Sequence, residues 1–410
     1  MRFPKWPQGL SLISGPVEAT VSPGPLGFFG TDLLALRPVL SVEIGQRVAA
    51  GSPLFHDRKR PWIVAASPVS GVVSRLDPGP RRSIAALEIT PEGEEAIEFD
   101  LAGAGTREGL IELMIGSGLW PFIRARPFGK VADPATHPEA LFITATEGFD
   151  GAPDPDAVIA ACGDWFWRGV RALPVLTGGA TYLCHRPGLD LPALPDVTAR
   201  AFAGGLGLAG AHIHELHPVA HGGMVWQIGW QEVIALGHLL ETGRIWQQRV
   251  VAVSGPAVTR PGLVAVKPGS RLHHIADGRL ADVPLRLLAG SRETGLATPF
   301  LAPGMRQVTA LAHHGASMRA GRLHRLLTPL AAPFIPNFWD EQASPPGVLP
   351  VPLLRALGSG DVEAARRLGV LGLVEEDIAG LNAHLGNGEN GGLDYRTLLR
   401  QTLDELEAVA

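Results

Sequence analysis

Four of the fourteen histidines of this chain fall within ten residues: His212, His214, His217 and His221. Imidazole is the commonest metal ligand in proteins, and on a strand His212 and His214 would project from the same face as a ligand pair. Only Glu215 is close in sequence to complete a site, and no cysteine is near. The alternative is that these imidazoles bond to backbone carbonyls in a glycine-rich crossing. The composition of the cluster favours that alternative, so these histidines are weak metal candidates.

A basic and aromatic loop lies at residues 121–130. It combines Arg124, Arg126 and Lys130 with Phe128, and prolines interrupt it. Arginine stacks on rings and forms paired hydrogen bonds to oxygens, so such a loop could hold an anion or an aromatic head group. The alternative is a solvated connection with phenylalanines packed beneath it. The residue types alone leave both interpretations open.

Two further patterns suggest chemistry but lack the required context. Gly205, Gly207 and Gly210 spell G-x-G-x-x-G, yet the residues that follow do not read as the amphipathic helix that a dinucleotide site needs. Lys59 sits in a turn between two strand-like segments, without the flanking pattern of a biotin or lipoate acceptor. No nucleophile, acid–base pair or phosphate loop appears in a suitable setting, so no catalytic residue is assigned.

Composition narrows the class of protein. A chain of 410 residues is long enough for two to four domains, and a net charge of −5 gives no electrostatic basis for binding nucleic acid. Two cysteines, Cys162 and Cys184, exclude a disulfide scaffold and fit a reducing cytoplasm. We see no signal peptide, and no run of about 18 apolar residues that would predict a spanning helix.

The elements that must position these residues fall into four parts. Residues 1–102 alternate apolar and polar positions around turn glycines, in two half-motifs at 42–55 and 63–76 that are typical of a biotinyl/lipoyl-like barrel-sandwich fold. Residues 103–256 alternate helix and strand, which favours an α/β layer with a largely parallel sheet. In that part we expect helices at 106–120, 157–170 and 231–240, and strands at 140–146, 172–176, 180–184, 197–202 and 249–256.

The second half of the chain changes character. Residues 257–345 predict a β-rich unit with strands at 263–266 and 285–288, a helical turn at Leu272, and a crossing rich in arginine and histidine at 313–338. Residues 346–410 predict a helical domain, in which Asp361 caps a helix.

Several of these residues occur together in one known family. Leu36-Arg37-Pro38 precedes the barrel motif, residues 117–120 and 126–130 follow, then His212 and His214, and finally a segment from Gly243 to Pro256. In this order, and with similar gaps, they resemble the A subunit of the Na⁺-translocating NADH:quinone oxidoreductase of bacterial membranes. The resemblance covers nearly the whole chain.

The resemblance implies a multidomain α/β protein with a barrel-sandwich hybrid, a Rossmann-like α/β domain, a β-grasp (SLBB-like) domain and a helical C-terminus. It implies a peripheral subunit on the cytoplasmic side of the bacterial inner membrane, partnered by membrane-embedded and flavin- or iron–sulfur-bearing subunits and carrying no redox centre itself. Ubiquinone is the implied ligand. The family regions linked to quinone binding correspond here to Leu36, Arg37, Pro38, Arg124, Arg126, Pro127, Phe128 and Lys130.

Two departures keep an alternative open. The family's cysteine motif before the last helix is replaced by the cysteine-free segment 381–395, and its Gly-Glu-Arg run is missing between residues 340 and 345. A diverged docking or assembly module of another membrane redox complex, without a ligand, is therefore the second hypothesis. Sodium transport, if it occurs, would belong to partner subunits.

Overall fold

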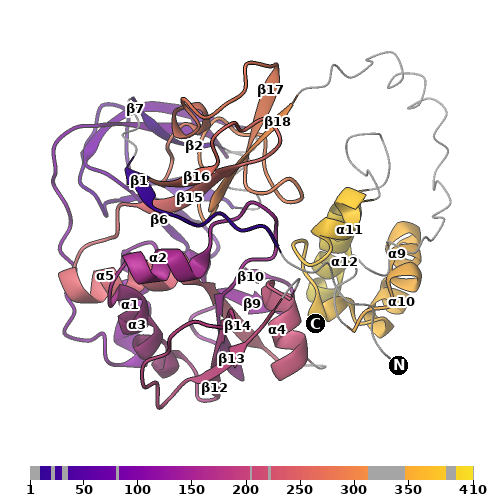
Figure 1. Ribbon diagram of the computed structural model, residues 1–410. Coiled ribbons are helices and arrows are strands. Elements are labelled where there is room, and N and C mark those ends of the chain that lie inside the picture. The colour runs from indigo at the N-terminus through magenta and orange to yellow at the C-terminus, as the bar shows by residue number, and fades with distance from the viewer. Residues whose placement is uncertain are drawn as a thin grey trace.

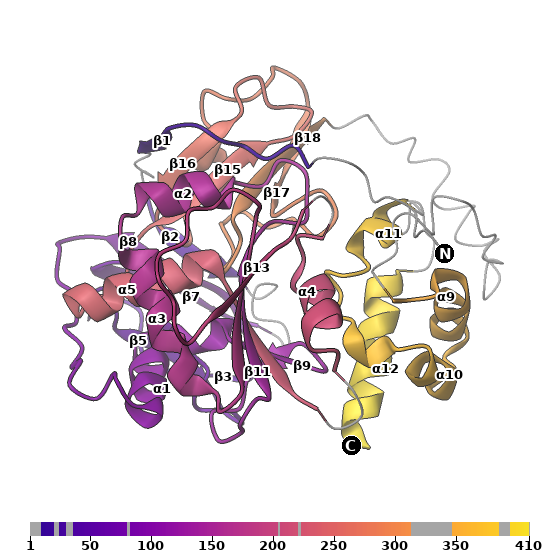
Figure 2. The same cartoon turned by 60° about the horizontal axis from the view of Figure 1, so that its bottom comes forward.

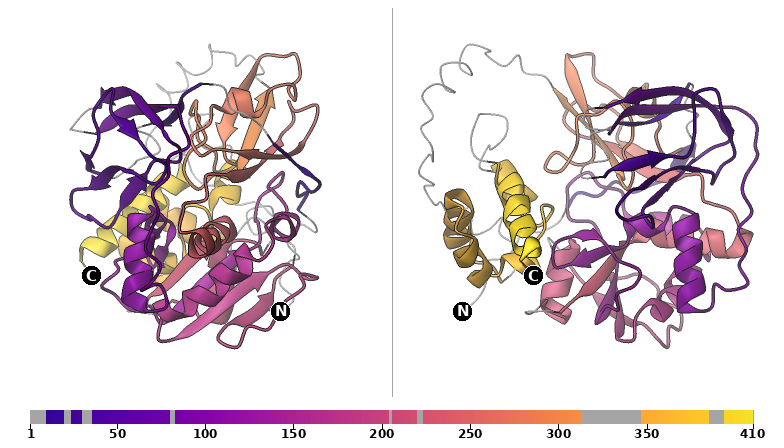
Figure 3. Two further views of the ribbon diagram at one scale, coloured as in Figure 1. Left: turned by 90° about the vertical axis from the view of Figure 1, so that its left-hand side faces the viewer. Right: turned by 180° about the vertical axis from the view of Figure 1, so that it is seen from behind.

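The computed structural model describes residues 10–19, 24–29, 36–79, 83–203, 206–219, 223–312, 347–384 and 394–409. Two β-rich units lie side by side above an α/β domain, and a helical unit packs against one side (Figure 1). The views in Figure 3 show the same arrangement from two further sides. No helix within these ranges has the length and apolar character needed to cross a membrane.

The first unit is a sandwich of two small antiparallel sheets. Their facing sides share a core around Leu54, Val73 and Leu87. Gly45 and Gly51 adopt positive φ at the turns, as the alternating half-motifs predicted. The strands, in sheet order, are β2 (Leu26–Phe29), β8 (Ile84–Pro91), β7 (Gly71–Pro78) and β4 (Arg47–Val48), and then β3 (Pro38–Leu40), β5 (Pro53–Asp57) and β6 (Val64–Ala66).

The α/β domain is built on a six-stranded sheet of four parallel strands, to which an antiparallel pair of short strands is added at one edge. Helices cover both faces (Figure 2). The sheet order is β10 (Lys130–Val131), β9 (Arg124–Arg126), β14 (Val225–Gly229), β11 (Ala140–Ala145), β12 (Ala180–His185) and β13 (Thr198–Ala201). The helices are α1 (Arg107–Gly116), α2 (Pro155–Ala161), α3 (Trp165–Ala172), α4 (Ala209–Leu216) and α5 (Trp230–Thr242), with short 3₁₀ turns η3 (Trp120–Phe122) and η4 (Leu173–Leu176).

Two local predictions in this domain are wrong. The helix expected at 157–170 is two helices, because the chain turns at Gly163, whose φ is 61°. The strand expected at 172–176 is the 3₁₀ turn η4, since Pro174 has no N–H to give to a sheet ladder. The helix expected at 231–240 is confirmed as α5, which ends at Gly243 in the left-handed cap conformation.

The third unit is a five-stranded sheet. Its order is β1 (Val17–Ala19), β16 (Gly262–Val266), β15 (Arg249–Ser254), β18 (Gln307–Ala312) and β17 (Leu285–Ala289), with the short helix α6 (Leu272–Ile275) packed on it. Strand β15, which the sequence pattern assigned to the α/β domain, pairs here with β16 and β18. Its run of buried valines fits either sheet, so hydrophobicity could not place it.

The C-terminal unit is helical, as predicted. Asp361 caps α10 by accepting a hydrogen bond from the Ala364 N–H at 2.9 Å. A separate apolar core, including Leu354, Leu399 and Leu403, holds the unit together. Its elements are α9 (Pro350–Ser359), α10 (Val362–Arg367), η5 (Val370–Gly372), α11 (Ala379–His384) and α12 (Tyr395–Ala408).

Candidate functional site

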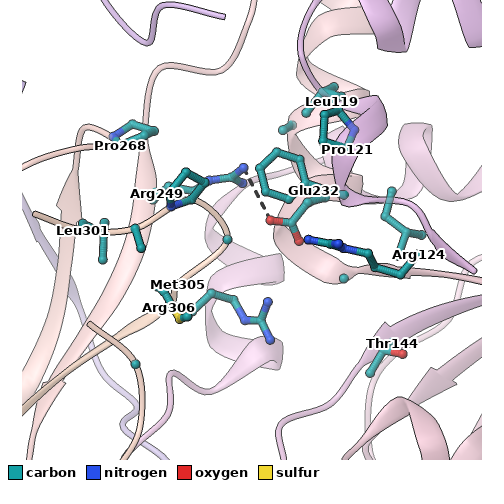
Figure 4. Close-up of a pocket in the computed structure, with 18 of the residues that line it drawn as sticks. Leu119, Pro121, Arg124, Thr144, Glu232, Arg249, Pro268, Leu301, Met305 and Arg306 are labelled. Atoms are coloured by element: carbon teal, nitrogen blue, oxygen red, sulfur yellow. Dashed lines mark ion pairs between the residues drawn. The ribbon is translucent and has the colours of Figure 1, made fainter. Parts of the chain in front are cut away.

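A cavity of about 680 Å³ lies at the carboxyl ends of β11 and β14, where all four units contribute to its wall. Figure 4 labels lining residues from the α/β domain and the third unit. In the sheet, β12 lies on one side of β11 and β14 lies on its other side. The chain continues from β11 to β12 and β13, and then returns through α4 to β14. Open α/β sheets bind ligands at such a reversal of strand order. The volume is also ordinary for a small-molecule site.

Most of the cavity wall is apolar. Aromatic and aliphatic side chains from the barrel face the α/β domain there, and residues between β17 and β18 continue the surface. The apolar lining includes Phe28, Leu36, Phe55, Ile63, Leu119, Pro121, Phe122, Leu301 and Met305. A ligand with a long apolar part would therefore find a matching surface.

Glu232 and Arg249 form an ion pair on the cavity wall, with 3.4 Å between Arg249 Nη2 and Glu232 Oε1 (Figure 4). Both are almost fully buried, at 3% and 8% exposed. Among the described residues, Glu232 Oε1 and Arg249 Nη1 have no hydrogen-bond partner, and neither does Thr144 Oγ1 on the same wall. Each such atom costs about 1–3 kcal/mol. All three atoms are closed off from the cavity space, so a ligand would not reach them in this arrangement.

Local structure explains this pair. Glu232 lies in the first turn of α5, where the helix dipole favours a negative charge. Arg249 begins β15, with its guanidinium carbon 5.5 Å from the Phe122 ring centre and 6.0 Å from that of Trp246. Burial lowers the pKa of Arg249, and Glu232 offsets only part of that effect.

A second ion pair on the wall is fully satisfied. Glu147, which follows β11, accepts hydrogen bonds from Arg306 Nε at 2.7 Å and from Trp230 Nε1 at 2.9 Å. Burial by itself would lower the pKa of Arg306, but Glu147 and Glu232 outweigh it and raise that pKa. This pair fastens the segment before β18 to the α/β domain.

Arg124 differs from both pairs. It lines the cavity from the start of β9 and forms no hydrogen bond or ion pair with any residue inside the described ranges. Its side chain is exposed, yet the surrounding protein atoms desolvate the guanidinium and lower its pKa, despite nearby Glu376 and Glu375. Neither carboxylate hydrogen-bonds to Arg124 in the described structure, so its N–H groups can meet a ligand oxygen.

The residues predicted for the quinone site separate in space. Leu36 and Arg124 line this cavity. The backbone N–H of Arg37 instead donates to buried Asp57 at 3.0 Å, and Pro38 begins strand β3 outside the lining. The remaining four predicted residues, Arg126, Pro127, Phe128 and Lys130, also lie outside the lining.

Arg126 is wholly buried and binds the C-terminal unit. Its guanidinium donates to Asp377 Oδ2 at 2.5 Å, to Glu376 Oε1 at 3.0 Å and to Gln227 Oε1 at 3.2 Å. Burial alone would lower its pKa, but Asp377 and Glu376 raise it instead. In this structure Arg126 is therefore a buried ion-pair partner of the C-terminal unit.

Phe128 and Lys130 reach the same unit. Phe128 packs on the C-terminal core, and its carbonyl accepts a hydrogen bond from Arg400 Nη1 at 2.8 Å. Lys130 pairs with Asp404 at 3.1 Å and also with Glu407. We call the contacts of Arg126, Phe128 and Lys130 with the C-terminal unit the ionic latch.

The glycine loop opens a helix after all, because α4 spans Ala209–Leu216. The expectation that no amphipathic helix follows is therefore wrong. The buried residues Ala209, Ala211 and Ile213 form the apolar face of α4. A Cβ at Gly210 would meet the Asp377 carboxylate, which lies beside the first turn of α4. That carboxylate stands where a dinucleotide phosphate would be expected, so the loop serves packing.

The three histidines of this stretch that the structure describes, His212, His214 and His217, do not form a cluster. Because α4 is a helix, His212 and His214 lie on different faces instead of forming a strand pair. His212 is buried and bonds the Leu206 carbonyl at 2.8 Å, as the backbone alternative predicted, whereas His217 pairs with Glu139 at 3.1 Å. His221 lies outside the described residues. Within the described ranges, no group of three or more metal-ligating side chains comes together.

Sequence patterns missed the polar residues that matter most here. Thr144 lies far along the chain from Glu232 and Arg249, and the three have no shared motif. One signal was available: Glu232 and Arg249 stand at the edges of otherwise apolar buried elements. Charged residues are almost never fully buried unless they are paired.

Comparison with known proteins identifies the family. Residues 14–92 match the model of the NqrA N-terminal barrel-sandwich hybrid domain, and residues 105–245 match that of the NqrA second alpha/beta domain. The chain is 35% identical over 431 aligned residues to the A subunit of the Na(+)-translocating NADH-quinone reductase of Pseudomonas aeruginosa (strain UCBPP-PA14), covering 95% of both. It is 33% identical to the A subunit of the same reductase of Saccharophagus degradans (strain 2-40), covering 98% of both.

Among solved structures, an NAD+-reducing [NiFe]-hydrogenase in the air-oxidized state shows a TM-score of 0.40 at 15% identity, covering 75% of this chain and 67% of the other. The sequence relatives, over nearly their full length, place this chain in the NqrA family, the A subunits of the Na(+)-translocating NADH-quinone reductases.

Proposed function

We propose that this chain is a peripheral, cytoplasmic-side subunit of a sodium-translocating NADH:quinone oxidoreductase, and that its central cavity holds a quinone. In this proposal the chain carries no redox centre, and membrane-embedded and flavin- or iron–sulfur-bearing subunits are its partners. The names of its relatives support the complex, because each is the A subunit of such a reductase. The cavity supports the ligand.

The five-stranded sheet supports a finer assignment of the fold. Strand β15 is parallel to its neighbour β18, and each pairs antiparallel with an outer strand, β16 or β17. Helix α6 lies between β16 and β17 in sequence. We propose that this unit is the β-grasp (SLBB-like) domain that the resemblance implied.

The observation that carries quinone binding is the combination of an apolar wall with one cation, Arg124, that has no hydrogen-bond partner among the described residues. A quinone presents two carbonyl acceptors on a flat ring, and an isoprenoid quinone adds an apolar tail. Arg124 lines the cavity with its side chain exposed, so its guanidinium can donate to one of these carbonyls. The barrel wall around Leu36 and Phe55 fits the tail.

The test is a titration of the purified chain with decylubiquinone, followed by calorimetry and by quenching of tryptophan fluorescence, since Trp246 lines the cavity. We expect micromolar binding that weakens about tenfold or more in Arg124→Met, because a hydrogen bond to a charged group contributes about 1.5–3 kcal/mol. Arg58→Met, an exposed arginine outside the cavity, should leave binding unchanged.

Absence of binding at micromolar concentration would contradict the ligand half of the proposal. It would then favour the alternative, a docking module that serves a membrane redox complex without a ligand of its own. Equal affinity of the wild type and Arg124→Met would show that the quinone sits elsewhere on the chain.

A further inference from the structure

Cationic side chains gather on the barrel unit, in the residue before β3 and in the turn between β5 and β6. We call this group the basic rim, and its members are Arg37, Arg58, Lys59 and Arg60. The Arg58 N–H donates to the Arg37 carbonyl at 2.9 Å, so the two segments are neighbours. Leu36 and Ile63, which line the cavity, flank the rim in the sequence. The rim therefore lies beside the apolar wall that the barrel gives to the cavity.

Asp57 organises the rim from within the turn. This carboxylate is 2% exposed, and it accepts backbone hydrogen bonds from Arg37 at 3.0 Å, Lys59 at 2.7 Å and Arg60 at 3.0 Å. Burial alone would raise the pKa of Asp57, but these hydrogen bonds outweigh it and lower that pKa. Trp62 packs against the core of the α/β domain and holds the turn there. The rim is thus a supported structure that presents its cations outward.

Most of the positive charge of the rim has no partner in the part of the chain that the structure describes. Arg37, Arg58 and Lys59 are exposed and form no ion pair there, whereas Arg60 lies 3.6 Å from the Asp57 carboxylate. After desolvation, the charge of Arg60 also contributes to the lowered pKa of Arg124, so the positive field reaches the cavity. Because the whole chain carries a net charge of −5, this local field would orient it on a negative surface.

We propose that the basic rim binds the headgroups of an anionic phospholipid bilayer and turns the cavity towards the lipid. This inference rests on the proposed function, since a quinone with an isoprenoid tail is dissolved in the bilayer. Each cation near an anionic membrane surface strengthens binding about fivefold. An acidic protein segment would meet the same charges, but it gives no reason for them to lie beside an apolar cavity.

The experiment measures sedimentation of the purified chain with vesicles of equal parts phosphatidylcholine and phosphatidylglycerol. We expect binding at about 0.01 M salt and its loss at about 1 M salt, because the Debye length falls from about 30 Å to about 3 Å. Vesicles of phosphatidylcholine alone should bind the chain at least about tenfold more weakly, since their surface lacks net negative charge.

The test variant combines Arg58→Gln with Lys59→Gln. It removes two exposed cations from the rim, so partition onto the anionic vesicles should fall about 25-fold. The matched control combines Arg366→Gln with Arg367→Gln, which removes the same charge from an exposed pair on α10. Its partition should fall less than about threefold, because the rim is intact.

The outcomes separate this inference from the proposed function. Absence of vesicle binding at low salt, or an equal loss in the two double variants, overturns the inference. Retention of the wild type on immobilised polyglutamate without vesicle binding assigns the rim to an acidic protein segment and overturns it as well. The decylubiquinone titration is read separately, because Arg58 and Lys59 lie outside the cavity lining. Vesicle binding without quinone binding contradicts the proposed ligand and leaves the lipid contact in place.

Discussion

The side chains of Arg124 and Arg126 lie on the same face of the short strand β9, yet their surroundings differ completely. Arg126 is buried in the ionic latch, where several acceptors satisfy its guanidinium. Arg124 stands in the cavity wall with no partner among the described residues. A satisfied buried charge holds structure together, whereas unsatisfied polar atoms around a cavity mark a place for a ligand.

Glu376 lies at the border of these two regions. It pairs with Arg126 at 3.0 Å and also lines the cavity. Burial and the neighbouring Asp377 raise its pKa, more than Arg126 lowers it. The latch and the cavity therefore share one carboxyl group, and the comparison between them can be tested by substitution.

The largest effect is expected from Arg126→Met, which leaves Asp377 buried without its cation. Loss of one partner of a buried pair costs about 3–5 kcal/mol, and denaturant unfolding with limited proteolysis of the C-terminal unit would measure it. Arg124→Met is the matched control and should change stability by only about 0.5 kcal/mol or less. Similar losses in both variants would erase the distinction between the two regions.

His212 tests an intermediate case, a buried group with one unpaired nitrogen that lies outside the cavity. Burial lowers its pKa to about 4. Between that value and the ordinary pKa of about 6.5, the unfolded chain binds more protons, so stability falls as the pH falls through this range. The contribution is about 3 kcal/mol, complete above pH ~6.5 and lost towards pH ~4.

The measurement is the free energy of unfolding between these pH values for the wild type and His212→Gln. We expect the variant to show a shallower dependence, while His214→Gln, at an exposed position on the same helix, keeps the wild-type slope. Identical slopes for wild type and His212→Gln would mean that the pKa of His212 is the same in the folded and unfolded chain.

The smallest effect is expected at the exposed end of the latch. Lys130 is 35% exposed and pairs with Asp404 and Glu407, which are more exposed still. Such pairs contribute about 0.2–1 kcal/mol, so Lys130→Met should shift the denaturation midpoint only slightly, and less at high salt. A loss as large as that of Arg126→Met would show that the whole latch, and not its buried arginine, carries the contact.

Local patterns predicted what depends on neighbours in sequence. Alternation around Gly45 and Gly51 predicted the barrel strands, and the sequence pattern at 231–240 predicted helix α5. Contacts between segments that are distant in the sequence could not be predicted. The acceptors of Arg126 include Asp377, 251 positions away, so nothing near this arginine could show that it is buried.

For the same reason, only part of the candidate site could be predicted from the sequence. Leu36 and Arg124 were predicted and line the cavity, but Glu232 and Arg249 were missed. The histidine stretch misled in a different way. Prolines, glycines and histidines hid a short helix, α4, whose apolar face is formed mainly by small alanines.

Strand β1 has a consequence for how the chain is made. Val17 pairs with Leu263, so the first described strand waits for a partner that is synthesised much later. At ribosomal rates of about 5–20 residues per second, that delay is on the order of 10–50 s. Until then strand β1 has no sheet to pair with, and its unpaired backbone groups are open to pairing with other strands. The sheet of the third unit can therefore be completed only after its later strands have been synthesised.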